Sequence, residues 1–172
     1  MPRRRRLALG WLLLVLALGF LLGRVFQPSG SFRPAPTPSD AWRGVEWVVD
    51  GDTLVLDGGE RVRLIGVDTP ELGSSPRARL PGQPDPFAEE ATAFVRTQVA
   101  GKRVRLAYGQ DPTDDYGRTL AYVYLEDGTF LNAELIRQGY GRAFTRFPFA
   151  YREEFRGLEA EARENRRGLW AR

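Results

Sequence analysis

The sequence predicts an α+β domain in which a small five-stranded β-barrel carries three helices. Short segments of alternating apolar residues are separated by tight-turn sequences, which is typical of a meander or a small barrel. A helical apolar stripe at residues 87–99 lies between the third and fourth of these segments, and another closes the chain at residues 149–165. Hydrophobic residues make up 42% of the 172 residues, which is enough for one core.

The first three strands are predicted at residues 42–49, 53–56 and 62–65. In the first of them, valine and tryptophan alternate on one face. Residues 50–52, Asp-Gly-Asp, turn the chain into the second strand, and residues 57–59, Asp-Gly-Gly, are a hairpin signal.

A long loop follows at residues 72–86, with four prolines, two glycines and two serines. Loops of this length in compact domains are functional or mobile. Asp85 is predicted to cap the next helix, with Pro86 at its first position, and Ala100-Gly101 is predicted to end it.

The fourth strand is predicted to begin at Val104, and the fifth spans residues 119–125. Helices are predicted at residues 132–138 and 149–165, the last ending before Gly168. Five strands and three helices, with one helix between strands three and four, indicate an OB-fold barrel. Such barrels often bind nucleic acids or sugars, but the fold does not determine the function.

The N-terminal part predicts export from the cytoplasm. Arg3–Arg6 precede an uncharged apolar run at residues 7–23, which indicates a signal-anchor or transmembrane helix, or a cleaved signal peptide, within residues 1–26. A proline-rich linker is predicted at residues 27–41, before an OB-fold domain at residues 42–172. The domain is therefore expected to be membrane-anchored and to face the extracytoplasmic side, or to be secreted if the leader is cleaved.

Composition excludes several kinds of chemistry. The chain has no cysteine and no histidine, which rules out thiolate nucleophiles, Ser-His-Asp hydrolysis and histidine-ligated metal sites. Carboxylates, arginines, hydroxyls and backbone groups remain, together with cations that prefer oxygen ligands. The net charge of +3 comes from the five arginines of residues 1–26; the remaining chain has 20 basic and 22 acidic residues, a balance of −2. Bulk charge therefore does not argue for nucleic-acid binding.

Two acid-rich strand ends could form a cation site. Asp50 and Asp52 lie two positions apart, and Asp68 ends the third strand segment. If the first and third strands are neighbours, Asp52 and Asp68 can converge on one Ca²⁺. The alternative is that these aspartates only stabilise turns through their own backbone.

Arg63, Arg118 and Glu71 suit phosphoryl chemistry. A guanidinium can hold two phosphate oxygens and neutralise the charge that develops there. A carboxylate beside a metal can accept a proton from attacking water or orient that water. Taken singly, an arginine or a glutamate of this kind is most often a solvated surface residue.

Taken together, these segments resemble the thermonuclease, or staphylococcal-nuclease-like, family. The matching strings, in order and spacing, are Val49-Asp50-Gly51-Asp52-Thr53, Arg63-Leu64-Ile65-Gly66-Val67-Asp68-Thr69-Pro70-Glu71, Asp115-Tyr116-Gly117-Arg118, Leu120-Ala121-Tyr122, the segment from Leu131-Asn132 to Gly139, and Gly168-Leu169-Trp170. The likeness covers residues 42–170.

The resemblance implies an OB-fold with three helices and Ca²⁺-dependent hydrolysis of DNA and RNA that leaves 3′-phosphates. It implies the following roles: Asp52 and Asp68 bind Ca²⁺ through their carboxylates and Thr69 through its carbonyl, Glu71 acts on the attacking water as a general base, Arg63 and Arg118 hold the scissile phosphate, and Tyr116 contacts the nucleotide. A monomer is expected.

The chain departs from the family pattern at two places. Asp115 stands where a lysine is usual, and Phe144-Thr145-Arg146-Phe147 replaces an expected tyrosine-rich wall. Phe144 or Phe147 could still stack on a base, and the loop arginines Arg77 and Arg79 could meet phosphates. The alternatives are a catalytically silent OB-fold module that binds nucleic acid or protein, and an envelope-tethered structural protein whose acids bind Ca²⁺ for stability.

Overall fold

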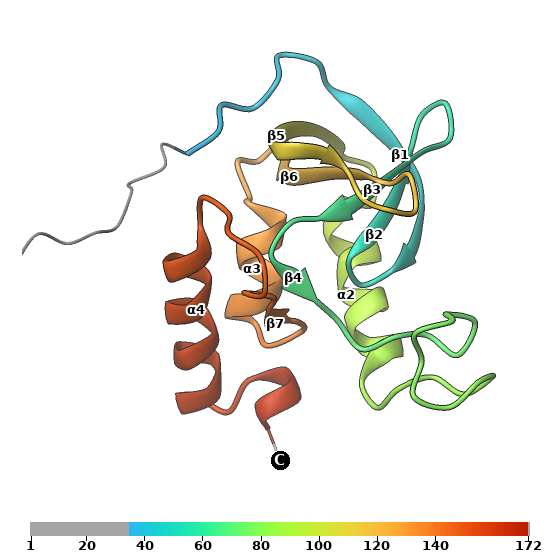
Figure 1. The fold of residues 1–172 in the computed structure, drawn as a ribbon, viewed down its shortest axis with the longest axis vertical. Helices are drawn as coiled ribbons and strands as arrows, with labels where there is room; N and C mark the ends of the chain where they lie inside the picture. Colours follow the sequence, from blue (N-terminus) through green and yellow to red (C-terminus); the bar gives the residue numbers. More distant parts are fainter. Residues whose placement is uncertain (1–34, 172) are drawn as a thin grey trace, which may run out of the picture. The chain divides into compact units, whose positions relative to one another are not determined.

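Five strands close into a barrel in the order β1-β2-β3-β6-β5 in the computed structural model, which describes residues 35–171 (Figure 1). The strands are β1 (Arg43–Asp50), β2 (Thr53–Leu56), β3 (Glu60–Leu64), β4 (Val67–Asp68), β5 (Arg103–Thr113), β6 (Thr119–Leu125) and β7 (Arg142–Ala143). The helices are α2 (Ala88–Val99), α3 (Leu131–Arg137) and α4 (Arg152–Glu164), with a final 3₁₀ turn, η1 (Gly168–Trp170).

The barrel is built from three hairpin pairings and closes through two long-range pairings. Strand β2 pairs antiparallel with both β1 and β3, and β5 pairs antiparallel with β6. Strand β3 then runs parallel to β6, and a short antiparallel contact joins β1 to β5. Gly58 and Gly59 both have positive φ, 87° and 80°, in the predicted hairpin turn, where glycine adopts this backbone conformation without strain.

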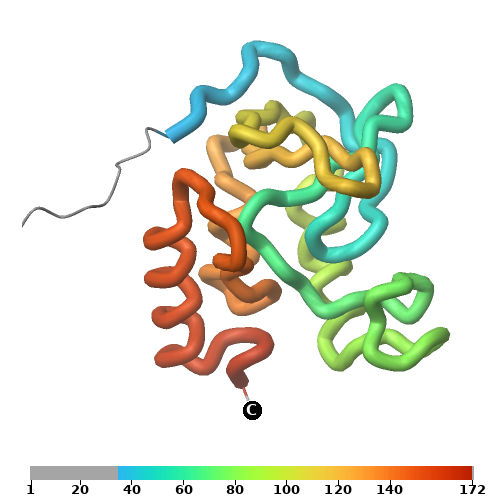
Figure 2. The backbone as a smooth tube through the Cα atoms, in the orientation of Figure 1, coloured from blue at the N-terminus to red at the C-terminus, as the bar shows by residue number. Residues whose placement is uncertain are grey.

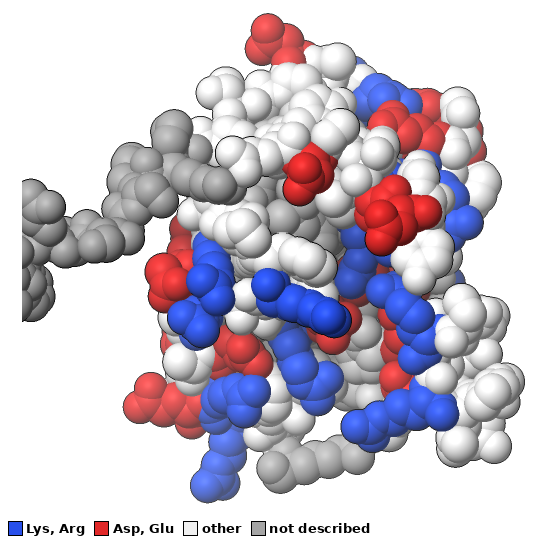
Figure 3. All heavy atoms as spheres, viewed as in Figure 1, with Lys and Arg blue, Asp and Glu red and all other residues white. Residues whose placement is uncertain are grey.

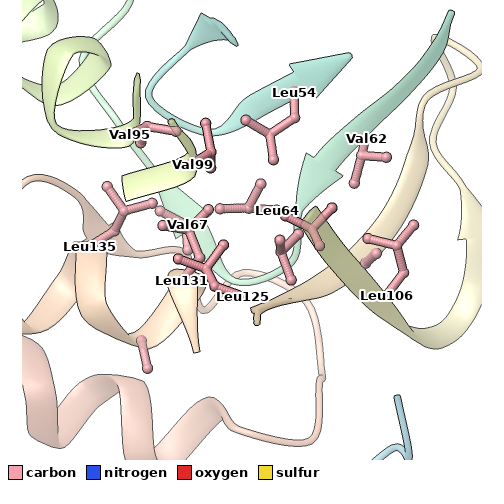
Figure 4. Packing of buried hydrophobic residues seen from close by; sticks show 14 of the residues in the cluster. Leu54, Val62, Leu64, Val67, Val95, Val99, Leu106, Leu125, Leu131 and Leu135 are labelled. Carbon is pink, nitrogen blue, oxygen red and sulfur yellow. The ribbon is translucent and has the colours of Figure 1, made fainter. Parts of the chain in front are cut away.

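The core fills the barrel and continues under the helices (Figure 4). Leu54, Leu64 and Leu106 are at most 1% exposed in the barrel. Val95 of α2 and Leu135 of α3 are fully buried against them. Burial of each such side chain contributes about 1.5–3 kcal/mol, so the elements that carry the candidate site rest on a rigid base.

The predicted helix start at Asp85 and Pro86 is wrong. Helix α2 begins at Ala88, and Phe87, with φ of 75°, occupies the N-cap position without a side-chain cap. The Asp85 carboxylate instead accepts hydrogen bonds from the backbone N–H groups of Arg79, at 3.0 Å, and Glu71, at 3.4 Å. The Asp85 carboxylate therefore fixes the long loop to the segment after β4, and only the Asp85 backbone carbonyl accepts a hydrogen bond from the helix, from the Ala88 N–H at 3.0 Å.

A small second sheet lies beside the barrel and was not predicted. Strand β4 leaves the barrel after β3 and pairs antiparallel with β7, so that Asp68 lies opposite Arg142. The turn between β3 and β4 depends on Gly66, which has φ of 75°. A Cβ atom there would lie 2.6 Å from the Phe149 ring, so only glycine fits this crossing.

The α+β prediction of a five-stranded barrel with three helices is confirmed for the described residues, and the strand order is consistent with an OB arrangement. The apolar run at residues 7–23 lies outside them; within residues 35–171, no helix combines the length and apolarity needed to cross a bilayer. Figure 2 follows residues 35–41 of the predicted linker along the barrel. The Ser39 N–H donates to the Leu106 carbonyl of β5 at 2.7 Å there.

Candidate active site

The candidate residues gather around β2, β3 and β4. Asp52 precedes β2, and the antiparallel register of β2 and β3 pairs Thr53 with Arg63. The Leu64 N–H donates to the Asp52 carbonyl at 2.9 Å, which holds the turn before β2 against β3. Thr69 follows β4 directly. Short connections between neighbouring strands therefore bring these residues to one place.

The two acid-rich strand ends meet at Asp52. Its Oδ2 accepts the Thr69 N–H at 3.0 Å, and its Oδ1 accepts the Thr53 hydroxyl at 3.2 Å. Asp50 stabilises the turn between β1 and β2, because its Oδ1 accepts the Asp52 N–H at 3.0 Å. Gly51 packs so closely on Thr69 that a Cβ atom there would lie 2.8 Å from the Thr69 hydroxyl oxygen. Asp50 thus makes the turn that the alternative interpretation expected, while Asp52 reaches across to β4.

Arg63 lies between Asp52 and Asp68. Its guanidinium forms an ion pair with Asp52 Oδ1, and its second terminal nitrogen lies 3.7 Å from Asp68 Oδ1. Burial, together with the nearby positive charges of Arg77 and Arg118, lowers the pKa of Arg63 to about 10. The guanidinium therefore stays charged at neutral pH and compensates a carboxylate that is only 1% exposed.

Arg118 is fixed by a turn just before β6. The Asp114 Oδ2 accepts from its Nε at 2.8 Å, and Asp114 Oδ1 accepts the backbone N–H groups of Tyr116 and Arg118 at 3.0 Å each. The Arg118 guanidinium also contacts the Thr53 hydroxyl at 3.4 Å and lies 5.5 Å from the centre of the Tyr116 ring. This arginine is thereby oriented beside the Asp52 turn.

Glu71 is buried and half satisfied. Its Oε1 pairs with Arg77 of the long loop at 2.7 Å, and its Oε2 has no hydrogen-bond partner among the described residues. A buried carboxylate oxygen without a donor is costly unless a ligand or water supplies one. Glu71 can therefore accept a hydrogen bond from a water molecule. The sequence did not reveal its pairing with Arg77.

The oxygen donors at this place fit a hard cation. The carboxylates of Asp52 and Asp68 are the donor chemistry that Ca²⁺ prefers when carbonyls and water complete the shell. The Thr69 N–H lies on Asp52 Oδ2, and the Thr69 carbonyl stays a predicted ligand. Across residues 35–171, no three acidic side chains form a metal-binding group on their own. Asp52 and Asp68 are also the carboxylates that Arg63 contacts, so their negative charge suits a cation.

An open groove of about 880 Å³ runs past Arg63 and Arg118. Four partly or largely exposed aromatic rings line it: Tyr108, Tyr116, Phe144 and Phe147. Tyr116 is 78% exposed, and the rings of Phe144 and Phe147 lie 6.0 Å apart. Exposed aromatic faces beside arginines are the parts from which stacking sites for nucleobases are built. Asp115 also lines this groove.

Sequence reasoning missed one basic residue next to the site. Arg142 of β7 lies opposite Asp68 in the small sheet, and cross-strand partners share a face. Its position depends on the pairing of two two-residue strands that are far apart in sequence, and no local pattern signals such a pairing. Figure 3 shows the Lys and Arg side chains that gather on this face, with acidic side chains among them.

Comparison with known proteins agrees with this geometry. The family described as "Staphylococcal nuclease homologue" matches residues 61–172. The chain is 36% identical to "Thermonuclease" of Staphylococcus intermedius, over 98% of this chain and 99% of the relative, and 32% identical to "Thermonuclease" of Staphylococcus hyicus, over 97% and 99%. It is 29% identical to "Endonuclease YhcR" of Bacillus subtilis, over 80% of this chain but 12% of that longer protein. The chain therefore belongs to the staphylococcal nuclease family of phosphodiesterases.

Proposed function

We propose that this nuclease hydrolyses phosphodiester bonds of DNA and RNA in a Ca²⁺-dependent reaction, with water as nucleophile and 3′-phosphate products. One observation carries the proposal: two carboxylates, the buried Arg63, the partly buried Arg118 and a half-satisfied glutamate converge beside a groove lined with aromatic rings. Asp68 and Arg77, the ion-pair partner of Glu71, border both the groove and the neighbouring hollow that contains Glu71.

Asp52, Asp68 and the Thr69 carbonyl would hold the Ca²⁺ ion, which would supply positive charge to the reaction. Arg63 compensates both carboxylates in the described structure. With a cation in that role, its guanidinium can turn its donors toward a phosphate. Arg63 and Arg118 then hold the non-bridging phosphate oxygens as charge develops on them.

Glu71 acts as the general base that accepts a proton from the attacking water. The water oxygen forms a bond to phosphorus, the bond from phosphorus to the 5′-oxygen breaks, and one water proton passes to Glu71 Oε2. The departing 5′-oxygen takes a proton from solvent, while the other fragment keeps the 3′-phosphate. Tyr116, exposed beside Arg118, contacts the nucleotide, and Phe144 and Phe147 provide further stacking faces in the same groove.

The decisive experiment incubates the full-length chain, in detergent, with single-stranded DNA and RNA, first with Ca²⁺ and then with excess chelator. Cleavage that requires Ca²⁺ and leaves 3′-phosphate ends supports the proposal. Cleavage that survives chelation contradicts the assignment of Asp52 and Asp68. Binding without cleavage, by a chain that is folded according to circular dichroism, would instead support the silent binding module.

Two variants with matched controls test the residue roles. Glu71→Gln keeps the size of the side chain but removes the proton acceptor, and should lower kcat by about 10²–10⁴-fold. Glu89→Gln makes the same change on the exposed side of α2 and should have no effect. Arg118→Ala should likewise abolish most turnover, whereas Arg96→Ala on α2 should not. Equal turnover of a site variant and its control would contradict the assigned roles.

We further propose that residues 1–26 export the domain and hold it at the extracytoplasmic side of a membrane, or are removed after export. The four arginines followed by an apolar run support this proposal. Protease added to intact cells should degrade the nuclease domain if it faces outward. Size-exclusion chromatography with light scattering should give the mass of a monomer.

A further inference from the structure

A second hollow of about 530 Å³ adjoins the aromatic groove. The two share Asp68 and Arg77 in their walls, so they adjoin each other beside the candidate active site and are together called the trough. The groove side is aromatic. The hollow instead contains Arg79 and Arg142, which have no role in the proposed reaction, and it is bordered by the end of the chain at residues 168, 169 and 171.

Arg142 is presented to this hollow by the small sheet. Its position opposite Asp68 places it on the same face as a proposed cation ligand. Its guanidinium lies 5.4 Å from the centre of the Trp170 ring. This cation–π contact orients the side chain but does not neutralise its positive charge. Within the described part of the chain, Arg142 forms no ion pair with a carboxylate.

Arg79 is held by Asp85 rather than neutralised by it. One Asp85 oxygen accepts the Arg79 backbone N–H at 3.0 Å, and the other accepts the Glu71 backbone N–H at 3.4 Å. The loop is therefore fixed relative to Glu71. The Arg79 guanidinium itself has no ion-pair partner among residues 35–171.

The acids of the hollow are largely compensated already. Arg77 pairs with Glu71 at 2.7 Å, Arg63 lies 3.7 Å from Asp68, and Asp85 accepts two backbone N–H groups. Two cationic forks thus remain available in the hollow that also contains Glu71. Such forks match the geometry of phosphate oxygens.

We propose that Arg79 and Arg142 form a subsite for the phosphodiester that neighbours the scissile one. The inference rests on the proposed function and refines its substrate class: the enzyme acts on polynucleotides that fill both sides of the trough, in preference to dinucleotides. Glu90 lines the same hollow and carries the charge that opposes such binding.

The test compares two single-stranded substrates, a dinucleotide and a strand about twelve nucleotides long, cut by the full-length chain with Ca²⁺. The Arg79→Ala/Arg142→Ala double variant should raise KM for the long strand at least tenfold and change kcat/KM for the dinucleotide less than twofold. The salt dependence of binding to the long strand should fall by about 0.7 for the lost phosphate contact. Glu90→Gln should lower KM for the long strand, and Arg96→Ala should change neither substrate.

The outcomes separate the two proposals. If the wild type cuts both substrates but the double variant loses equally on both, or on neither, the subsite is refuted and the nuclease mechanism stands. If Glu90→Gln weakens binding of the long strand, the electrostatic basis of the subsite is also wrong. If the folded wild type cuts neither substrate, the proposed function fails and the subsite fails with it.

Discussion

Replacement of Asn132 by alanine should destabilise the strand that leads into the active site. Asn132 is fully buried at the start of α3. Its Oδ1 accepts the Val123 N–H of β6 at 2.9 Å, and its Nδ2 donates to the carbonyls of Ile65, at 3.0 Å, and Ala121, at 3.3 Å. The Ala121 carbonyl keeps the Ile65 N–H as a partner at 3.0 Å, so alanine at position 132 would orphan the buried Val123 N–H and the partly buried Ile65 carbonyl.

Each orphaned group costs about 1–3 kcal/mol, so Asn132→Ala should lose roughly 2–6 kcal/mol, a large share of a typical stability of about 5–15 kcal/mol. Urea unfolding followed by tryptophan fluorescence measures the loss, with Asn165→Ala on the exposed end of α4 as the same change outside the core. Asn132→Asp keeps the acceptor for Val123 but turns an oxygen toward two carbonyls, and should lose at least as much at pH 7. A loss below about 1 kcal/mol for Asn132→Ala, at an unchanged m-value, would refute the reasoning.

Three further results are expected. Arg63→Ala leaves a buried carboxylate without its counter-ion and should cost roughly 3–5 kcal/mol, which added Ca²⁺ should partly restore in thermal melts. Gly51→Ala should weaken Ca²⁺ binding in calorimetry because its methyl group meets Thr69, whereas Gly157→Ala, with open space around it, should not. The hydroxyl of Thr119 donates a hydrogen bond to Glu60 and lowers the pKa of this carboxyl; partial burial opposes the shift, and Arg43 adds to it. The ionised carboxylate therefore stabilises the fold above pH of about 4.3, and this stabilisation is lost in acid. Glu60→Gln should therefore be less stable than wild type by under about 1 kcal/mol at pH 7, and the two acid-unfolding curves should converge below pH of about 4.

The barrel could be predicted from sequence because its information is local. Alternating apolar residues and the Asp-Gly-Gly turn at residues 57–59 determine β2 and β3 and their register. That register places Arg63 beside Asp52, so the centre of the candidate site follows from short-range patterns. The stripe of α4 was also correct, since Phe155 and Ala162 are fully buried.

The parts that could not be predicted depend on contacts between distant segments. Asp85 carries the local signature of a helix cap, but the folded loop offers it backbone donors from Arg79 and Glu71 instead. The pairing of Glu71 with Arg77 and the position of Arg142 both require the loop and the β4–β7 sheet to be in place. Propensity and periodicity contain no information about such contacts, whereas the ordered set of family strings identified Glu71 as a candidate without them.

The barrel has its fewest paired residues where β1 meets β5. Strand β1 contacts β5 through two residue pairs, Arg43 with Val104 and Gly44 with Arg103, whereas β5 and β6 share six. Arg43 and Val104 are 61 positions apart in sequence, so closing this loop costs chain entropy, and we expect β1 and β5 to pair late in folding. This seam should open first in native-state hydrogen exchange, and when it opens it exposes two unpaired strand edges. The hydrogen bond from Ser39 to Leu106 adds one more contact at this seam. The segment just before β1 should therefore keep the edge of β5 covered and unavailable for pairing with another chain.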